Sequence, residues 1–181
     1  MITPVDAIPE LRILEPKVFQ DDRGYFYETY NKKAYGEHGI SDNFVQDNQS
    51  LSKKGALRGM HYQIASNAQS KLVRVIHGAV FDVAVDMRKE SASFGKWFGL
   101  VLSGENKLQF YIPRGFAHGF LTLTDTALFS YKCDNFYAKE DERGFRFDDH
   151  EIAIGWPELD TSMIVSSKDK ELPSFKQAYT F

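Results

Sequence analysis

The sequence predicts an all-β fold, an antiparallel β-barrel of the jelly-roll (cupin) type. Apolar and polar residues alternate along several segments, as in GAVFDVAVDMR at 78–88, and a period of two is typical of strands. Glycine and proline turns separate these segments at short intervals, which favours antiparallel pairing. Aromatic residues make up 14% of the chain, and barrels of this class often enclose a small ligand.

Individual segments support this fold in order along the chain. In the segment at 78–88, Phe81, Val83, Val85 and Met87 share one face and Asp82 and Asp86 the other, which predicts a half-buried strand. The segments NKLQFYIP and TALFSYKC repeat the alternation, and the second places Phe129, Tyr131 and Cys133 on one face. Short helices are expected only at NKKAYGEHG (31–39) in the N-terminal region and in the C-terminal tail after residue 156.

Composition limits the possible functions. The 181 residues, 43% of them hydrophobic, suit a single domain spanning 1–181. A net charge of −3, without a long basic run, argues against a nucleic-acid partner. One cysteine excludes an internal disulfide, and the first residues lack a signal-peptide core, so we expect a cytoplasmic protein. The apolar stretches are too short to span a membrane.

The segment GALRGMHYQ (55–63) concentrates polar residues in a predicted strand. Strict alternation puts His61 and Gln63 on one face with Gly59, and Arg58 on the opposite face with Met60. A lone histidine on a strand is most often a buried residue with a satisfied hydrogen bond. Further polar residues on neighbouring strands make a binding site the better interpretation here.

Those further residues are His118, in PRGFAHGF, and Lys71, on the same predicted face as Val73 and Val75. An inward lysine is costly unless it has a partner or a function. Two histidines in a barrel raise the alternative of a metal-dependent cupin enzyme. The usual His-x-His pair with a downstream glutamate is absent around His61, so we expect neither a metal nor another cofactor.

Seven segments in order carry a specific resemblance: DDRGYFYE, FVQDNQSLSKKGALRGMHYQ, KLVRVIHGAVFDVAVDMR, IPRGFAHGF, YKCDNFYAKEDERGFRFDD, IGWP and SSKD. Together they resemble the dTDP-4-dehydrorhamnose 3,5-epimerase family over nearly the whole chain. The resemblance implies a metal-free jelly-roll barrel, a homodimer, and a dTDP-linked 4-keto-6-deoxyhexose as substrate. One departure is Met60, where the family usually has leucine, and a swap that conserves volume should matter little.

The resemblance also implies catalytic roles. Inversion at C3 and C5 needs a base on one side of the sugar, an acid on the other, and a group that stabilises the enolate oxygen. By residue-for-residue match, His61 is the base and Tyr131 the acid. Asp169 matches the aspartate that orients the imidazole, and Lys71 matches the lysine near the C4 oxygen.

Substrate-binding roles follow from the same match. The matched binding positions are Gln46, Asp47, Asn48, Arg58, Lys71, His118, Tyr137, Glu142 and Lys168, and Arg23 and Glu28 match residues supplied by the partner subunit. Tyr137 corresponds to the aromatic that stacks on thymine, and Arg58 to an arginine that contacts the diphosphate. Because alternation points Arg58 away from His61, a twist or bulge must bring it round.

Two alternatives to the 3,5-epimerase stay open besides the metal-dependent cupin enzyme. One is an epimerase that inverts a single centre or acts on another 4-keto sugar with the same base and acid. The other is a binding domain for sugar nucleotides without catalysis, which the presence of both a base and an acid disfavours.

Overall fold

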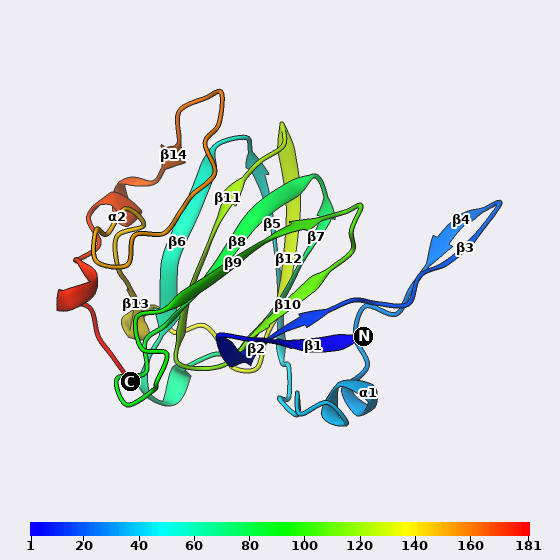
Figure 1. Cartoon of the computed structure of the whole chain (residues 1–181), viewed down its shortest axis with the longest axis horizontal. Helices are drawn as coiled ribbons and strands as arrows, with labels where there is room; N and C mark the ends of the chain where they lie inside the picture. The colour runs from blue at the N-terminus through cyan, green and yellow to red at the C-terminus, as the bar shows by residue number, and fades with distance from the viewer.

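A computed structural model of all 181 residues shows two antiparallel sheets packed face to face as a jelly-roll barrel (Figure 1). The first sheet has the order β1-β2-β10-β7-β12-β5, and the second has the order β13-β6-β11-β8-β9, with β14 parallel to β6. The strands of the first sheet are β1 (Ile2–Val5), β2 (Ile8–Leu14), β5 (Gln46–Lys53), β7 (Lys71–His77), β10 (Gln109–Ile112) and β12 (Thr126–Cys133). Those of the second are β6 (Ala56–Gln63), β8 (Ala79–Asp86), β9 (Trp97–Ser103), β11 (Phe116–Thr122), β13 (Glu142–Gly144) and β14 (Ile164–Val165). The predicted all-β class is confirmed.

Helices are short. They are α1 (Lys32–Gly36), α2 (Ser167–Lys170) and the 3-10 turns Ala65–Asn67, Lys139–Asp141 and Phe175–Gln177. Three of the five lie at the two predicted positions, whereas the 3-10 turns Ala65–Asn67 and Lys139–Asp141 were not predicted. No helix is long and apolar enough to cross a membrane.

The main core lies between the two sheets. Inward residues of β7, β8, β10 and β12 meet there, among them Val75, Val80, Phe110 and Phe129, each at most 1% exposed. Phe110 and Phe129 lie on the faces that the alternation predicts. The same inward face of β12 continues to Tyr131, which packs against this core. Hydrophobic packing therefore fixes the wall that presents the tyrosine.

The structure corrects the prediction that β8 is half-buried. Asp82 and Asp86 are both fully buried, because each face of β8 is covered. One face looks into the barrel, and on the other Val83 packs in a second core with Phe175 from the C-terminal segment. Main-chain hydrogen bonds of 2.9 Å between Phe181 and the chain just after β8 hold this segment in place. Asp82 therefore faces the barrel interior.

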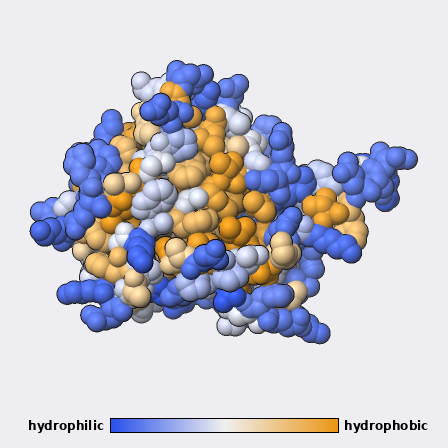
Figure 2. Space-filling view, viewed as in Figure 1, coloured by the Kyte–Doolittle hydropathy of each residue, from blue (hydrophilic) through white to orange (hydrophobic).

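A β-hairpin extends from the body as an arm, at the right of Figure 1. It consists of β3 (Phe19–Asp21) and β4 (Gly24–Phe26). Phe19 is 53% exposed and Phe26 70% exposed. Figure 2 shows a hydrophilic tip and hydrophobic residues nearer the body. A two-stranded ribbon alone is marginally stable in water. The exposure of Phe19 and Phe26 shows that the arm also has little packing against the rest of its own chain.

Candidate active site

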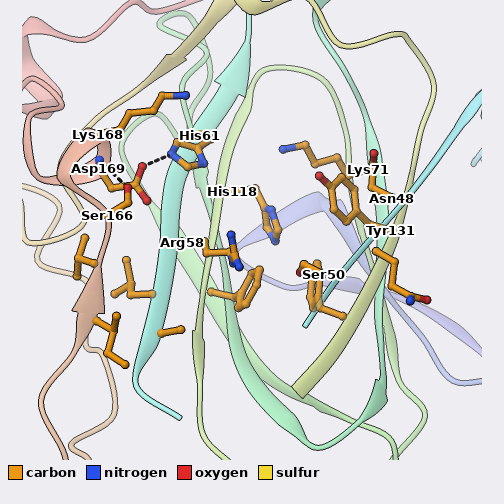
Figure 3. Close-up of a pocket in the computed structure, with 17 residues that line it drawn as sticks. Asn48, Ser50, Arg58, His61, Lys71, His118, Tyr131, Ser166, Lys168 and Asp169 are labelled. Carbon is orange, nitrogen blue, oxygen red and sulfur yellow. Dashed lines mark hydrogen bonds and ion pairs between the residues drawn. The ribbon is translucent and has the colours of Figure 1, made fainter. Parts of the chain in front are cut away.

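Two adjoining cavities lie between the sheets, where β5, at the edge of the first sheet, faces β6 of the second. The inner cavity has a volume of about 600 Å³ and the outer cavity about 350 Å³, sizes usual for small-molecule sites. Arg58, His118, Phe120 and Phe129 line only the inner cavity, Gln46, Gln63, Tyr137 and Glu142 line only the outer one, and Asn48, His61, Lys71 and Tyr131 line both. The predicted base, acid and lysine thus meet at the junction (Figure 3).

His61 is oriented by a buried carboxylate. Its Nε2 lies 2.7 Å from Oδ1 of Asp169, which is 4% exposed. Burial raises the pKa of Asp169, but hydrogen bonds from His61 and the main chain of Gly59 outweigh it, and the net pKa is lowered. An ionised carboxylate only accepts hydrogen bonds, so a neutral His61 imidazole carries its proton on Nε2 and keeps the lone pair of Nδ1 free.

Local helix geometry places Asp169. The Ser166 side chain caps α2 by accepting a hydrogen bond of 3.1 Å from the main-chain N–H of Asp169. Asp169 is thereby fixed in the first turn of α2, close to β6 because β14, just before α2, pairs with that strand. A cap of this kind stabilises a helix by about 1 kcal/mol. Ser166 is a supporting residue that the sequence prediction did not include.

Tyr131 approaches from the opposite wall. It lies on β12 beside Asn48 of β5, and Figure 3 shows its ring across the cavity from His61. Burial raises its pKa to about 12, so the phenol is protonated at neutral pH. The hydroxyl has no hydrogen-bond partner within the chain, so Tyr131 has a proton available to donate into the cavity.

Lys71 begins β7, where it pairs with Cys133 of β12. Its ammonium group has no ion-pair partner within the chain and lines both cavities. Burial lowers its pKa, while the charges of Asp82 and Glu142 act in the opposite direction. A poorly solvated cation at this point interacts strongly with any negative charge that develops beside it.

A second His–Asp pair lies deeper in the barrel. His118 Nε2 contacts both carboxylate oxygens of Asp82, at 2.9 and 3.0 Å. Burial raises the pKa of Asp82 and lowers that of His118, and their mutual attraction offsets part of each change. The residue pattern predicted no functional role for Asp82. The signal that could have found it is an acidic residue in the middle of an otherwise apolar strand.

A β-bulge brings Arg58 to the same side as His61. On β11, His118 lies opposite His61 and Phe120 opposite Arg58, so a three-residue step on β6 matches a two-residue step on β11. The extra residue reverses the alternation, and the tension in the sequence prediction is resolved. Close strand approach requires glycine here, since a Cβ on Gly59 (φ +132°) would lie 2.6 Å from the Cα of Gly119.

The outer cavity gathers the other predicted contacts. Glu142 accepts hydrogen bonds from Lys168 Nζ at 2.5 Å and from the Tyr137 hydroxyl at 2.8 Å. Burial raises the pKa of Glu142, but these two bonds bring it below its usual value. Gln46 Nε2 donates to Asn48 at 3.0 Å. This wall of the outer cavity carries amides and an exposed aromatic ring, and Lys168, which lines the inner cavity, is joined to it through Glu142.

Three predicted binding residues do not enter either cavity. Asp47 lies between two inward residues of β5, so alternation turns it to the outer face, where it pairs with Lys132 at 2.8 Å. The Asp47 side chain is therefore not placed to contact a ligand in either cavity. Arg23 lies at the tip of the arm, paired with Asp21, and Glu28 accepts hydrogen bonds from a neighbouring asparagine. Neither Arg23 nor Glu28 reaches the cavities of its own chain.

The metal-dependent alternative finds no suitable set of ligands. No group of three or more histidine, cysteine, aspartate or glutamate side chains is placed to hold a metal ion. Each histidine of the cavity instead has one nitrogen engaged by a carboxylate.

Comparisons with known proteins agree with the geometry. The family model described as dTDP-4-dehydrorhamnose 3,5-epimerase matches residues 6–177. The enzyme of that name from Escherichia coli is 54% identical, over 91% of this chain and 89% of its own. A Legionella pneumophila 3,5-epimerase, solved with dTDP-4-keto-L-rhamnose, has 49% identity and a TM-score of 0.94, covering 98% of this chain and 93% of its own. A 3'-monoepimerase from Streptomyces bikiniensis, with dTDP-quinovose, has 30% identity and a TM-score of 0.89, over 96% and 87%.

Proposed function

Because the chain belongs to the dTDP-4-dehydrorhamnose 3,5-epimerase family, we propose that it inverts C3 and C5 of dTDP-4-dehydro-6-deoxy-D-glucose. The product is dTDP-4-dehydro-L-rhamnose, an intermediate of dTDP-L-rhamnose biosynthesis. Identities near 50% with 3,5-epimerases, against 30% with a monoepimerase, favour inversion of both centres. We take residues 1–181 as one epimerase domain.

One observation carries the mechanism: His61 and Tyr131 stand on opposite walls with Lys71 beside them. The protons on C3 and C5 flank the C4 carbonyl and are therefore acidic. Nδ1 of His61 removes one of them, and the C4 oxygen becomes an enolate beside the Lys71 ammonium. Tyr131 then donates a proton to the opposite face, which inverts the centre. Asp169 stabilises the imidazolium formed in the first step.

The order of residues along the barrel gives the substrate a direction. From the outer to the inner cavity, paired residues of β5 and β12 run from Gln46 and Cys133 through Asn48 and Tyr131 to Ser50 and Phe129. The base and acid thus lie between the outer cavity and the inner end. A nucleotide sugar that enters the outer cavity first places its reactive ring at this junction.

We place the thymine base on Tyr137 and the diphosphate near Asn48, which lines both cavities. In an extended substrate whose sugar reaches His61, the sugar is then the only part within reach of Arg58, because Arg58 lines the inner cavity alone. Arg58 accordingly faces sugar oxygens, in place of the diphosphate contact that the family resemblance implies.

The position of Arg58 can be measured with a ligand that lacks the sugar. The variant Arg58→Met should bind dTDP within about twofold of wild type and lose turnover of the full substrate. A loss of dTDP affinity of about tenfold, 1.4 kcal/mol, would show instead that Arg58 contacts the diphosphate.

We also propose a homodimer whose sites are completed across the interface. The arm exposes Phe19 and Phe26, and the outer face of the first sheet exposes Leu51 (65%). A second copy would cover these surfaces, and its arm would bring Arg23 and Glu28 to the cavity. The free, buried Cys133 fits a reducing, cytoplasmic location.

Mixing two inactive variants tests the shared site. In a mixed dimer of Arg23→Ala with His61→Asn, one site receives both an intact arm and an intact base. Random exchange should restore about a quarter of the sites, since half the dimers are mixed and one of their two sites is complete. Lack of restoration in dimers shown to exchange subunits would contradict sharing.

The activity itself is tested by NMR in D₂O with dTDP-4-keto-6-deoxyglucose. We expect solvent deuterium at both C3 and C5 and conversion to the L-rhamno product. Exchange at C3 alone would identify a monoepimerase, and binding without any exchange would identify a non-catalytic domain.

A further inference from the structure

The loop between β12 and β13 (residues 134–141) presents Tyr137 over the outer cavity. Tyr137 is 52% exposed, and apart from the 3-10 turn Lys139–Asp141 the loop has no regular structure. An aromatic ring on such a segment would be mobile unless its main chain were fixed. The value of Tyr137 as a stacking surface therefore depends on what holds this loop.

Three glutamines from three different segments hold its main chain. Gln46 on β5 accepts a hydrogen bond through Oε1 from the N–H of Tyr137, at 3.2 Å. Gln63 on β6 accepts through Oε1 from the N–H of Ala138, at 2.7 Å. Gln69, just before β7, donates through Nε2 to the carbonyl of Asn135, also at 2.7 Å.

Gln63 is the most constrained of the three. It is 5% exposed, and its cross-strand partner is Glu142, which bonds the Tyr137 hydroxyl. Its Oε1 is engaged by the loop, while its buried Nε2 has no partner within the chain. The amide therefore contributes through one directional bond, and loss of that bond leaves the Ala138 N–H without its partner.

Figure 3 shows the proton-transfer groups, which belong to strands and to α2 and not to this loop. Movement of the loop would displace the ring of Tyr137 and leave His61 and Tyr131 in place. The loop anchors should thus influence binding of the nucleotide more than the chemical step.

We propose that Gln63 and Gln69 are positioning residues that fix the Tyr137 ring and thereby set the affinity for the nucleobase. Gln46 contributes the third anchor. This inference rests on the proposed function, in which Tyr137 stacks on the base. Neither Gln63 nor Gln69 takes part in proton transfer.

The test uses Gln63→Met and Gln69→Met, which keep an unbranched side chain of similar length and remove the amide. Gln177→Met is the matched control, because Gln177 bonds only Ser174 in the C-terminal segment and lines neither cavity. Calorimetry with dTDP should show about tenfold weaker binding for each anchor variant, within the range of a lost base-stacking contact. KM should rise in parallel while kcat holds, and the control should match wild type.

A double variant separates positioning from direct contact. With Tyr137→Ala already present, Gln63→Met should weaken dTDP binding no further, since the ring that it positions is gone. Additive losses would overturn the proposal in favour of a direct contact or a general loss of structure. Unchanged dTDP affinity in Gln63→Met would also overturn it.

Hydrogen exchange of the loop, measured without ligand, tests the anchor itself. Peptides covering 134–141 should exchange faster in Gln63→Met and Gln69→Met than in wild type or the control. Equal exchange would overturn the anchoring. If Tyr137→Ala leaves dTDP affinity unchanged, the stacking role and this inference both fail, while deuterium uptake by wild type still decides the proposed function.

Discussion

Replacement of Tyr131 by phenylalanine should separate proton removal from inversion. If His61 removes the proton and Tyr131 returns one to the other face, the variant still forms the enolate. His61 then reprotonates the face from which it took the proton. We expect epimerised product to fall by about 10²-fold or more, the scale of a positioned general acid, while deuterium still enters the unepimerised substrate with retention.

The structure also sets the expected cost in stability. The hydroxyl of Tyr131 has no partner within the chain, and the ring packs against Phe129 at a centroid distance of 5.9 Å. Phenylalanine keeps that packing and loses no internal hydrogen bond. The free energy of unfolding should therefore change by less than about 0.5 kcal/mol. A structural tyrosine with a satisfied hydroxyl would instead lose about 1 kcal/mol.

The assay is NMR in D₂O, with the ratio of inversion to exchange measured for both proteins at equal folded fraction. A large fall in this ratio supports the role of Tyr131 as the acid. An unchanged ratio, with both rates lowered together, would refute the reasoning, because loss of the acid must affect inversion selectively.

Four further predictions concern the remaining groups. Turnover should survive exhaustive chelation; a loss restored by a divalent ion would refute a mechanism carried by side chains alone. His61→Asn should abolish deuterium uptake at both C3 and C5, and survival of either near the normal rate would show another base. Asp82→Asn should move the alkaline limb of the kcat/KM pH profile to lower pH, because burial already lowers the pKa of Lys71 and the variant removes one negative charge that raises it. An unchanged alkaline limb would contradict this coupling. Because its pKa is lowered in the folded protein, Asp169 stabilises the fold fully above its ordinary pKa of 3.8, and this stabilisation is lost as the pH falls through the lowered pKa. Urea titrations of Asp169→Asn should therefore show a smaller decline in the free energy of unfolding below about pH 4 than those of wild type.

Strand alternation predicted the walls of the site well. It turned Tyr131 and Lys71 inward from the residue pattern alone, and both line the cavities. It failed for Arg58, because alternation holds only while the register is continuous. The bulge opposite Gly119 depends on how β6 pairs with β11. The sequence of one strand does not specify the register in which its partner pairs with it.

Burial of β8 was missed for a related reason. A strand with Asp82 and Asp86 on one face reads as half-exposed when its neighbours are unknown. The segment that covers β8 includes Phe181, which is distant from β8 in the sequence. The buried Asp82 is tolerated inside the barrel because it is hydrogen-bonded to His118. The pattern of one segment therefore could not distinguish a solvated carboxylate from a buried one.

The two His–Asp pairs show why residue identity alone does not assign a role. Both join a histidine Nε2 to an aspartate, across 108 residues for His61 and 36 for His118. The side chain of His61 is 27% exposed and its aspartate has a lowered pKa, whereas that of His118 is 8% exposed with a lowered pKa of its own. A base must accept a proton and hold the resulting charge, and a partly exposed histidine side chain holds a charge at lower cost than a buried one. Burial lowers the pKa of His118 and so disfavours its charged form, and the difference in depth between the two pairs therefore supports the proposal that His61 is the base.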